Sequence, residues 1–290
     1  MTADILVSTL VSGLVLGSLY ALMASGLSLV WTTLGVFNFA HGALMMIGAM
    51  VAWSVAVQAE MGLLPGLLAG VVAAAALGAV IERLLVRPFY GQRNMLLITV
   101  MTTLAAMIIL EKGAQMIWGA RLKQLPRLIP GEVSLGGAVI SAHEAAIVVI
   151  APLTLLALWA YAQRSASGRS LRAAGQNRDA AALIGIDVPR AFMLAFALSA
   201  ALAGLTGGLL GSIRFVTPTM GAEPLLMAMI VVIFGGLGSL GATVGAAYVI
   251  GFLEALLVLV VGLYWTPSVL FLIIIAVLVL RPEGLFGRSS

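Results

Sequence analysis

The side chains able to do chemistry in this chain are few, and they lie scattered along apolar stretches. The acidic residues inside those stretches are Glu82, Glu111 and Glu254, and the two histidines, His41 and His143, are far apart in sequence. A hydrolase needs a nucleophile with a base, paired carboxylates or metal ligands. The sequence has no HExxH or GxSxG motif, no phosphate-binding lysine loop and no cysteine. We therefore expect no catalytic residues, no cofactor and no metal site, and we do not expect an enzyme.

The densest polar group inside an apolar stretch is NFAHG, residues 38–42. A polar side chain is costly in lipid, so Asn38 and His41 should face a bundle interior or a cavity. Two interpretations stay open. Asn38, His41 and Gly42 line a passage or gate, or Asn38 caps the helix that enters at Phe39 while His41 bonds a neighbouring backbone.

Two of the acidic residues favour structural roles. Glu254 could couple transport to protons, but no intramembrane partner is evident from the sequence, and a lone Glu near the outer end of its helix reaches water. A structural or subunit-interface role is therefore favoured. Glu82 and Arg83 end an apolar stretch together, which predicts a surface ion pair.

The composition explains why these residues sit among apolar neighbours. The chain is 62% hydrophobic and 9% charged, with a mean hydropathy of +1.16, whereas ordinary soluble domains are about 25% charged. This predicts a polytopic membrane protein. Its apolar runs are continuous rather than alternating, so its crossings should be helices. The net charge of +4 is better explained by arginine retained on one membrane face than by nucleic acid.

The apolar runs predict an all-α transmembrane bundle of about eight spans, forming one domain over residues 1–290. A helix needs roughly 20 apolar residues to cross a bilayer. The expected helices are Ile5–Trp31, Phe37–Val57, Leu63–Leu85, Met95–Trp118, Ala142–Tyr161, Ala191–Ile213, Leu225–Phe234, Ala242–Val261 and Pro267–Leu280.

Glycine spacing adds two expectations. Small-xxx-small pairs, which let helices approach closely, occur at Gly13/Gly17, Gly66/Gly70, Gly204/Gly208, Gly207/Gly211 and Gly241/Gly245. The seventh helix is too short to cross comfortably and runs into FGGLGSLGA. That segment is either a break inside the membrane or a turn at its edge. Three of its glycines are candidate path residues: Gly235, Gly236 and Gly238.

The one long polar stretch is residues 162–190, which hold five of the fifteen Lys and Arg residues. With the segments around 82–94 and 281–290, the latter containing Arg281 and Arg288, this face carries ten of the fifteen. The richer face should be cytoplasmic, which predicts a multi-pass protein of the inner membrane. A charged loop on that face is where a soluble partner could dock.

Within this loop the sequence predicts a short helix, Ala180–Ile184. Asn177 and Asp179 are suitable N-terminal caps, Gly185 should stop the helix, and Pro189 should open the next span. Such a short helix is marginal alone, so its apolar face (Ala181, Leu183, Ile184) should pack against the bundle or into a partner's groove. The alternative is an ordinary solvated loop.

Four motifs in order resemble the LivH-type permease of branched-chain amino acid ABC importers. They cover about residues 10–287 and read GSLYALMASGLSLVWTTLGVFNFAHGALMMIGAM, SLRAAGQNRDAAALIGIDVPR, VVIFGGLGSLGATVGA and RPEGLFG. The resemblance implies a second related permease, two cytoplasmic ATP-binding subunits, a periplasmic or lipid-anchored solute-binding protein, and no nucleic acid. It also implies an ATPase-coupling segment over residues 174–186, carried here by Gly175, Asp179, Ala180, Ala181, Leu183, Gly185 and Ile186.

Some points stay open beside this resemblance. Gln176, Asn177 and Arg178 stand where members of the family often have more acidic residues, which would affect pairing with a particular ATPase. The family also includes permeases for urea and short amides, so the solute could be branched-chain amino acids, other amino acids or an amide. An ion-coupled secondary transporter, an intramembrane enzyme and an assembly protein are the remaining alternatives.

Overall fold

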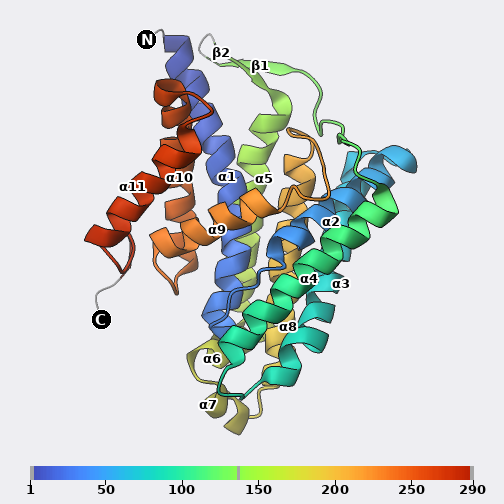
Figure 1. The fold of residues 1–290 in the computed structure, drawn as a ribbon, viewed down its shortest axis with the longest axis vertical. Coiled ribbons are helices and arrows are strands. Elements are labelled where there is room, and N and C mark those ends of the chain that lie inside the picture. Colours follow the sequence, from blue (N-terminus) through green and yellow to red (C-terminus); the bar gives the residue numbers. More distant parts are fainter. Residues whose placement is uncertain (1–2, 136–137, 288–290) are drawn as a thin grey trace. The chain divides into compact units, whose positions relative to one another are not determined.

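The computed structural model describes residues 3–135 and 138–287, and Arg288 lies outside them. Over these residues the chain is mostly helical, which confirms the expected all-α membrane bundle (Figure 1). Within residues 3–135 and 138–287, seven helical stretches are long and apolar enough to cross a membrane. The α-helices are α1 (Ala3–Leu34), α2 (His41–Trp53), α3 (Leu63–Ile81), α4 (Met95–Trp118), α5 (Ala142–Arg164), α6 (Ala166–Gln176), α7 (Arg178–Leu183), α8 (Val188–Leu210), α9 (Ala222–Gly235), α10 (Leu240–Val261) and α11 (Thr266–Leu280).

Two membrane helices change their winding at one end. α2 continues into the π-helical turn η1 (Ser54–Gln58), and α3 continues into the π-helical turn η2 (Glu82–Val86) followed by the 3-10 turn η3 (Arg87–Phe89). Proline at 88 lacks the backbone donor that a longer helix would need. π-Helical turns are rare and often lie at functional positions.

A short hairpin departs from the helical pattern. Strands β1 (Glu132–Leu135) and β2 (Ala138–Ser141) pair antiparallel, with Glu132 opposite Ser141. They occupy the loop before α5. The short run of alternating residues there was too brief to be recognised as a hairpin from the sequence.

The chain folds into two compact units that interleave in sequence. The first unit combines the residues up to Ser25, Arg127–Leu155 and those from Met227 onwards, and the second combines Gly26–Pro126 and Leu156–Leu226. Several helices therefore pass from one unit to the other.

The core of the second unit is built from α2, α3 and α8, which pack directly on one another. Glycines make this possible. A Cβ on Gly204 would stand 2.7 Å from the Cβ of Ala74, and one on Gly78 would stand 2.5 Å from the Cβ of Ala200. Both distances are shorter than real Cβ atoms allow. The predicted close packing at Gly204/Gly208 is thus confirmed.

In the first unit α1 packs against α10. A Cβ on Gly13 would stand 2.5 Å from the ring of Phe252, and one on Gly17 would stand 2.7 Å from that of Tyr248. The expectation of close packing fails at Gly241, where an added Cβ would meet only Ser239 Oγ, at 3.9 Å. Gly241 begins a helix at an open turn, so no neighbouring helix requires its small size.

Candidate functional site

The predicted coupling loop, residues 162–190, folds as two short helices. α6 begins at a Ser165 cap, whose Oγ accepts a hydrogen bond from Gly168 N at 2.8 Å. Gly168, Leu171 and Ala174 form its buried face, and α6 packs on α8. α6 thus lies against the bundle.

α7 is the predicted short helix, beginning two residues earlier than expected. Asn177 caps it, because its Oδ1 accepts from Ala180 N at 2.9 Å. At the other end Gly185 has a φ of +84°. Gly185 N donates to Ala182 O and Ile186 N donates to Ala181 O, which is the Schellman arrangement that stops a helix. The cap at Asn177 and the stop at Gly185 are confirmed.

The expected apolar face of α7 is divided between the bundle and the surface. Ala181 is buried, with 2% of its surface exposed, whereas Leu183 and Ile184 are 88% and 76% exposed. These two apolar side chains are therefore not covered by the rest of the described chain. Of the other predicted coupling residues, Asp179 and Ala180 are exposed and Ile186 is half-buried.

Gly175 is held against α1 at the end of α6. Its residue surface is exposed, but an added Cβ would stand 2.5 Å from Thr32 O. A side chain there would push α6 away from the bundle. Gly175 therefore acts by fit within its own chain, whereas Leu183 and Ile184 face outward.

Asn38, His41 and Gly42 lie together inside the second unit, all buried. Asn38 Oδ1 accepts from Ala40 N at 3.1 Å, so it braces the turn before α2, while Asn38 Nδ2 has no hydrogen-bond partner among the described residues. His41 Nδ1 lies 3.2 Å from Ser199 Oγ on α8. An added Cβ on Gly42 would overlap the carbonyl of Gly221. The cluster is polar, desolvated and tightly packed.

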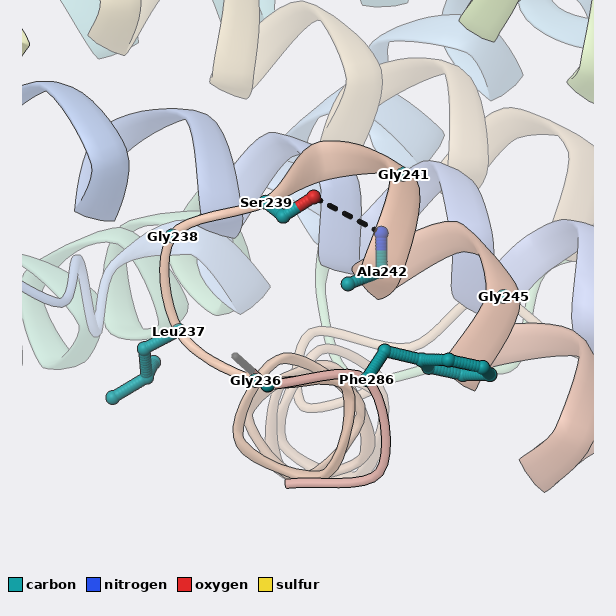
Figure 2. Close-up of a pocket in the computed structure, with 9 residues that line it drawn as sticks. Gly236, Leu237, Gly238, Ser239, Gly241, Ala242, Gly245 and Phe286 are labelled. Carbon is teal, nitrogen blue, oxygen red and sulfur yellow. Dashed lines mark hydrogen bonds between the residues drawn. The ribbon is translucent and has the colours of Figure 1, made fainter. Parts of the chain in front are cut away.

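Gly235 is the last residue of α9, and Gly236 and Gly238 lie in the turn before α10, so FGGLGSLGA joins two helices through a turn. The segment 281–287 folds back on it within the same unit. Leu285 N donates to Phe234 O at 2.6 Å. This turn, the start of α10 and Phe286 line a pocket of about 670 Å³. Figure 2 shows the lining residues. Two motifs recognised separately in the sequence thus form one local structure.

Glu82 is buried, and the predicted surface pair with Arg83 is wrong. Its side chain is 0% exposed, its Oε1 accepts from Tyr90 Oη at 2.5 Å, and Arg87 Nε lies 3.9 Å away. Glu82 is the first residue of the π-helical turn η2, and Tyr90 directly follows η3. Burial, and then the hydrogen bond to Glu82, raise the pKa of the Tyr90 hydroxyl. Tyr90 therefore stays a donor at physiological pH.

Glu254 has an intramembrane partner that the sequence did not reveal. Its Oε2 accepts a hydrogen bond from Tyr20 Oη at 2.6 Å, within the first unit. The two residues are far apart in sequence, so only the packing of α1 on α10 brings them together. Among the described residues, no group of three or more His, Cys, Asp or Glu side chains is placed to hold a metal ion.

Comparison with known proteins places this geometry in context. A family model described as the branched-chain amino acid transport system permease component matches residues 9–278. The high-affinity branched-chain amino acid transport system permease protein BraD of Pseudomonas aeruginosa is 32% identical over 97% of this chain and 95% of its own. The corresponding protein LivH of Escherichia coli is 31% identical over 96% of this chain and 94% of its own. A probable LivH permease of Methanocaldococcus jannaschii is 28% identical over 94% and 90%. No solved structure matches the chain significantly.

Proposed function

Because this chain belongs to the family of branched-chain amino acid transport system permease components, we propose that it is a permease subunit of an ATP-driven importer for leucine, isoleucine and valine. The match over residues 9–278 carries this proposal. The chain is a multi-pass membrane protein, with seven helices able to span a membrane in the part that the structure describes. We place it in the inner membrane, with the arginine-rich face inside, and assign it no catalytic step of its own.

The partners proposed for it are a second related permease, two ATP-binding subunits and a solute-binding protein. Most polar side chains buried in the described part of the chain have a hydrogen-bond partner within it, and the half-buried Glu254 accepts from Tyr20. A permease of this kind holds its solute weakly. Selectivity then belongs mainly to the binding protein, and the energy comes from separate ATPase subunits.

The segment around α7 is proposed to dock on an ATPase subunit. Leu183 and Ile184 supply exposed apolar surface next to the exposed Asp179 and Ala180. Burying Leu183 and Ile184 in a partner's groove would remove apolar surface from water, the dominant favourable term in association. Gly175, Ala181, Gly185 and Ile186 would hold the segment in the shape that presents this surface. Movement of the ATPase subunits would then shift the helices on either side of the segment.

Asn38, His41 and Gly42, with Gly235, Gly236 and Gly238, are proposed to border the translocation path. Asn38 Nδ2 is a buried donor without a partner among the described residues, and an amino-acid carboxylate would accept from it once the helices part. The chain has no cysteine, so N38C would carry the single thiol. Its labelling by a water-soluble maleimide should rise during turnover, whereas G113C, in open space on α4, should label equally in both states.

Uptake in a strain deleted for this gene tests the function. Complementation should restore accumulation of radiolabelled leucine, and excess isoleucine or valine should compete with it more strongly than urea or acetamide does. Purifying the tagged chain should bring down two ATP-binding chains and a second permease. Uptake that survives removal of those ATPases but collapses with the proton gradient would contradict the proposal and favour an ion-coupled transporter. Competition by urea or acetamide alone would contradict the proposed solutes.

A further inference from the structure

Arg178, the first residue of α7, turns its guanidinium towards its own bundle although the residue as a whole stays exposed. Its Nη2 donates to Leu34 O at 3.0 Å, and its Nη1 lies 3.7 Å from Met95 Sδ. Its Cζ stands 5.6 Å from the centre of the Phe192 ring. One side chain thus joins α7 to the ends of α1, α4 and α8. The sequence had suggested that Arg178 would affect pairing with an ATPase.

The contact at Leu34 has a clear physical basis. Leu34 is the last residue of α1, and the last four carbonyl groups of a helix have no intrahelical donor. A cation at that end also interacts favourably with the helix dipole. Arg178 therefore satisfies the end of α1 with a charge-assisted hydrogen bond, which is stronger than a bond between neutral groups.

From Phe192 the contacts continue to the end of α3. The rings of Phe192 and Tyr90 meet edge to face, with centroids 5.2 Å apart and planes at 84°. Tyr90 in turn donates to the buried Glu82 in the π-helical turn η2. Glu82 Oε2 has no hydrogen-bond partner among the described residues. A buried carboxyl group held on one oxygen is sensitive to the position of its donor, because loss of that hydrogen bond leaves only Arg87 Nε nearby, at 3.9 Å.

We propose that Arg178 is a positioning residue that carries movement of α7 to the ends of α1 and α3, through Leu34 and through the Phe192–Tyr90–Glu82 stack. This inference rests on the proposed docking of α7 on an ATPase subunit. α7 has six residues, too few to be stable as an isolated helix. Its buried Ala181 fixes where α7 sits, and Arg178 links that position to residues of three membrane helices.

We call this path from Arg178 to the ends of α1 and α3 the relay. It is tested in the whole transporter, purified by a tag on this chain and reconstituted in liposomes with its binding protein. R178Q should keep the ATPase subunits bound but lower the radiolabelled leucine moved per ATP hydrolysed about tenfold, the effect expected from one lost charged hydrogen bond. R169Q is the matched control. Arg169 is exposed in the same segment, and the one bond described for its side chain is to Arg164 O, so R169Q should keep the wild-type ratio.

Two further variants separate a relay from a purely structural role. Y90F removes the hydroxyl that holds Glu82 and should lower the same ratio. R178Q combined with Y90F should be no worse than R178Q alone, because both cut one chain of contacts. R178K, which keeps the charge but not the planar donor pair, should recover part of the ratio and serves as the test variant if R178Q does not accumulate.

The outcomes distinguish the relay from the function on which it rests. If R178Q moves as much leucine per ATP hydrolysed as the wild type does, the relay is overturned. The same holds for R178K where R178K is the variant measured. Additive losses in the R178Q Y90F double variant also overturn it. Loss of ATPase co-purification in R178Q would place Arg178 in the docking surface and also overturn it. If the wild-type chain brings down no ATPase, the proposed function itself fails.

Discussion

Ser199 Oγ lies 3.2 Å from His41 Nδ1 and so links α8 to the start of α2, with both side chains fully buried. Across two membrane helices such a bond contributes about 0.6 kcal/mol on average and at most about 1.7 kcal/mol. S199A should therefore lower the free energy of unfolding of the detergent-solubilised protein by an amount in this range, and with it the melting temperature. S8A, which removes an exposed hydroxyl bonded within α1, is the control and should melt with the wild type. Equal melting of S199A and S8A would show that the bond contributes nothing.

Packing at Gly207 should tolerate no side chain. An added Cβ would overlap Met45 O on α2, a backbone atom that cannot move without shifting a helix. Overpacking of this kind costs about 1–3 kcal/mol, so G207A should lose stability and should also lower uptake. G113A is the matched control, because Gly113 lies within α4 with open space around it. It should be neutral or slightly stabilising, since alanine favours helix more than glycine does. Similar melting temperatures for G207A and G113A would argue against the packing described.

Which residues can replace Gly185 depends on the backbone conformation there rather than on the space around it. Nothing lies within 4 Å of an added Cβ, but φ is +84°, which β-branched residues adopt only with strain. G185V should therefore distort the end of α7 and lower co-purification of the ATPase subunits several-fold, whereas G185N should be milder because asparagine visits this region. Equal binding by G185V, G185N and wild type would show that the Gly185 turn does not shape the docking surface.

The helices could be predicted from the sequence because their length and continuous hydrophobicity are local properties. The cap at Asn177 and the stop at Gly185 were also predictable, since both depend on neighbouring residues. Contacts between distant residues were not. Glu82 lies in a π-helical turn and accepts a hydrogen bond from Tyr90. Hydrophobic periodicity predicts neither the π-helical turn nor this bond. The Tyr20–Glu254 bond and the inward turn of Arg178 depend in the same way on helix packing.

Glu254 offers a test of the ion-coupled alternative. Its Oε2 accepts from Tyr20 Oη at 2.6 Å, and the amide oxygen of glutamine can accept the same hydrogen bond. E254Q removes the titratable proton but keeps that contact, so leucine uptake should stay within about twofold of wild type if the carboxylate is structural, a change below about 1 kcal/mol. E254L, which cannot accept from Tyr20, should lose more activity and stability. Uptake abolished in E254Q at normal abundance in the membrane would point to proton coupling.

Leu183 allows docking to be separated from folding. Its side chain is 88% exposed on α7, so L183D should leave the melting temperature of the isolated chain nearly unchanged, as surface substitutions usually do within about 0.5 kcal/mol. A charge in an apolar groove is costly, so the same variant should bind the ATPase subunits at least about tenfold more weakly and lose uptake in proportion. S167D adds the same charge at an exposed position of α6 and should bind normally. If L183D and S167D co-purify equal amounts of ATPase, the docking surface lies elsewhere. If both lose it, general repulsion is the cause and Leu183 has no special part.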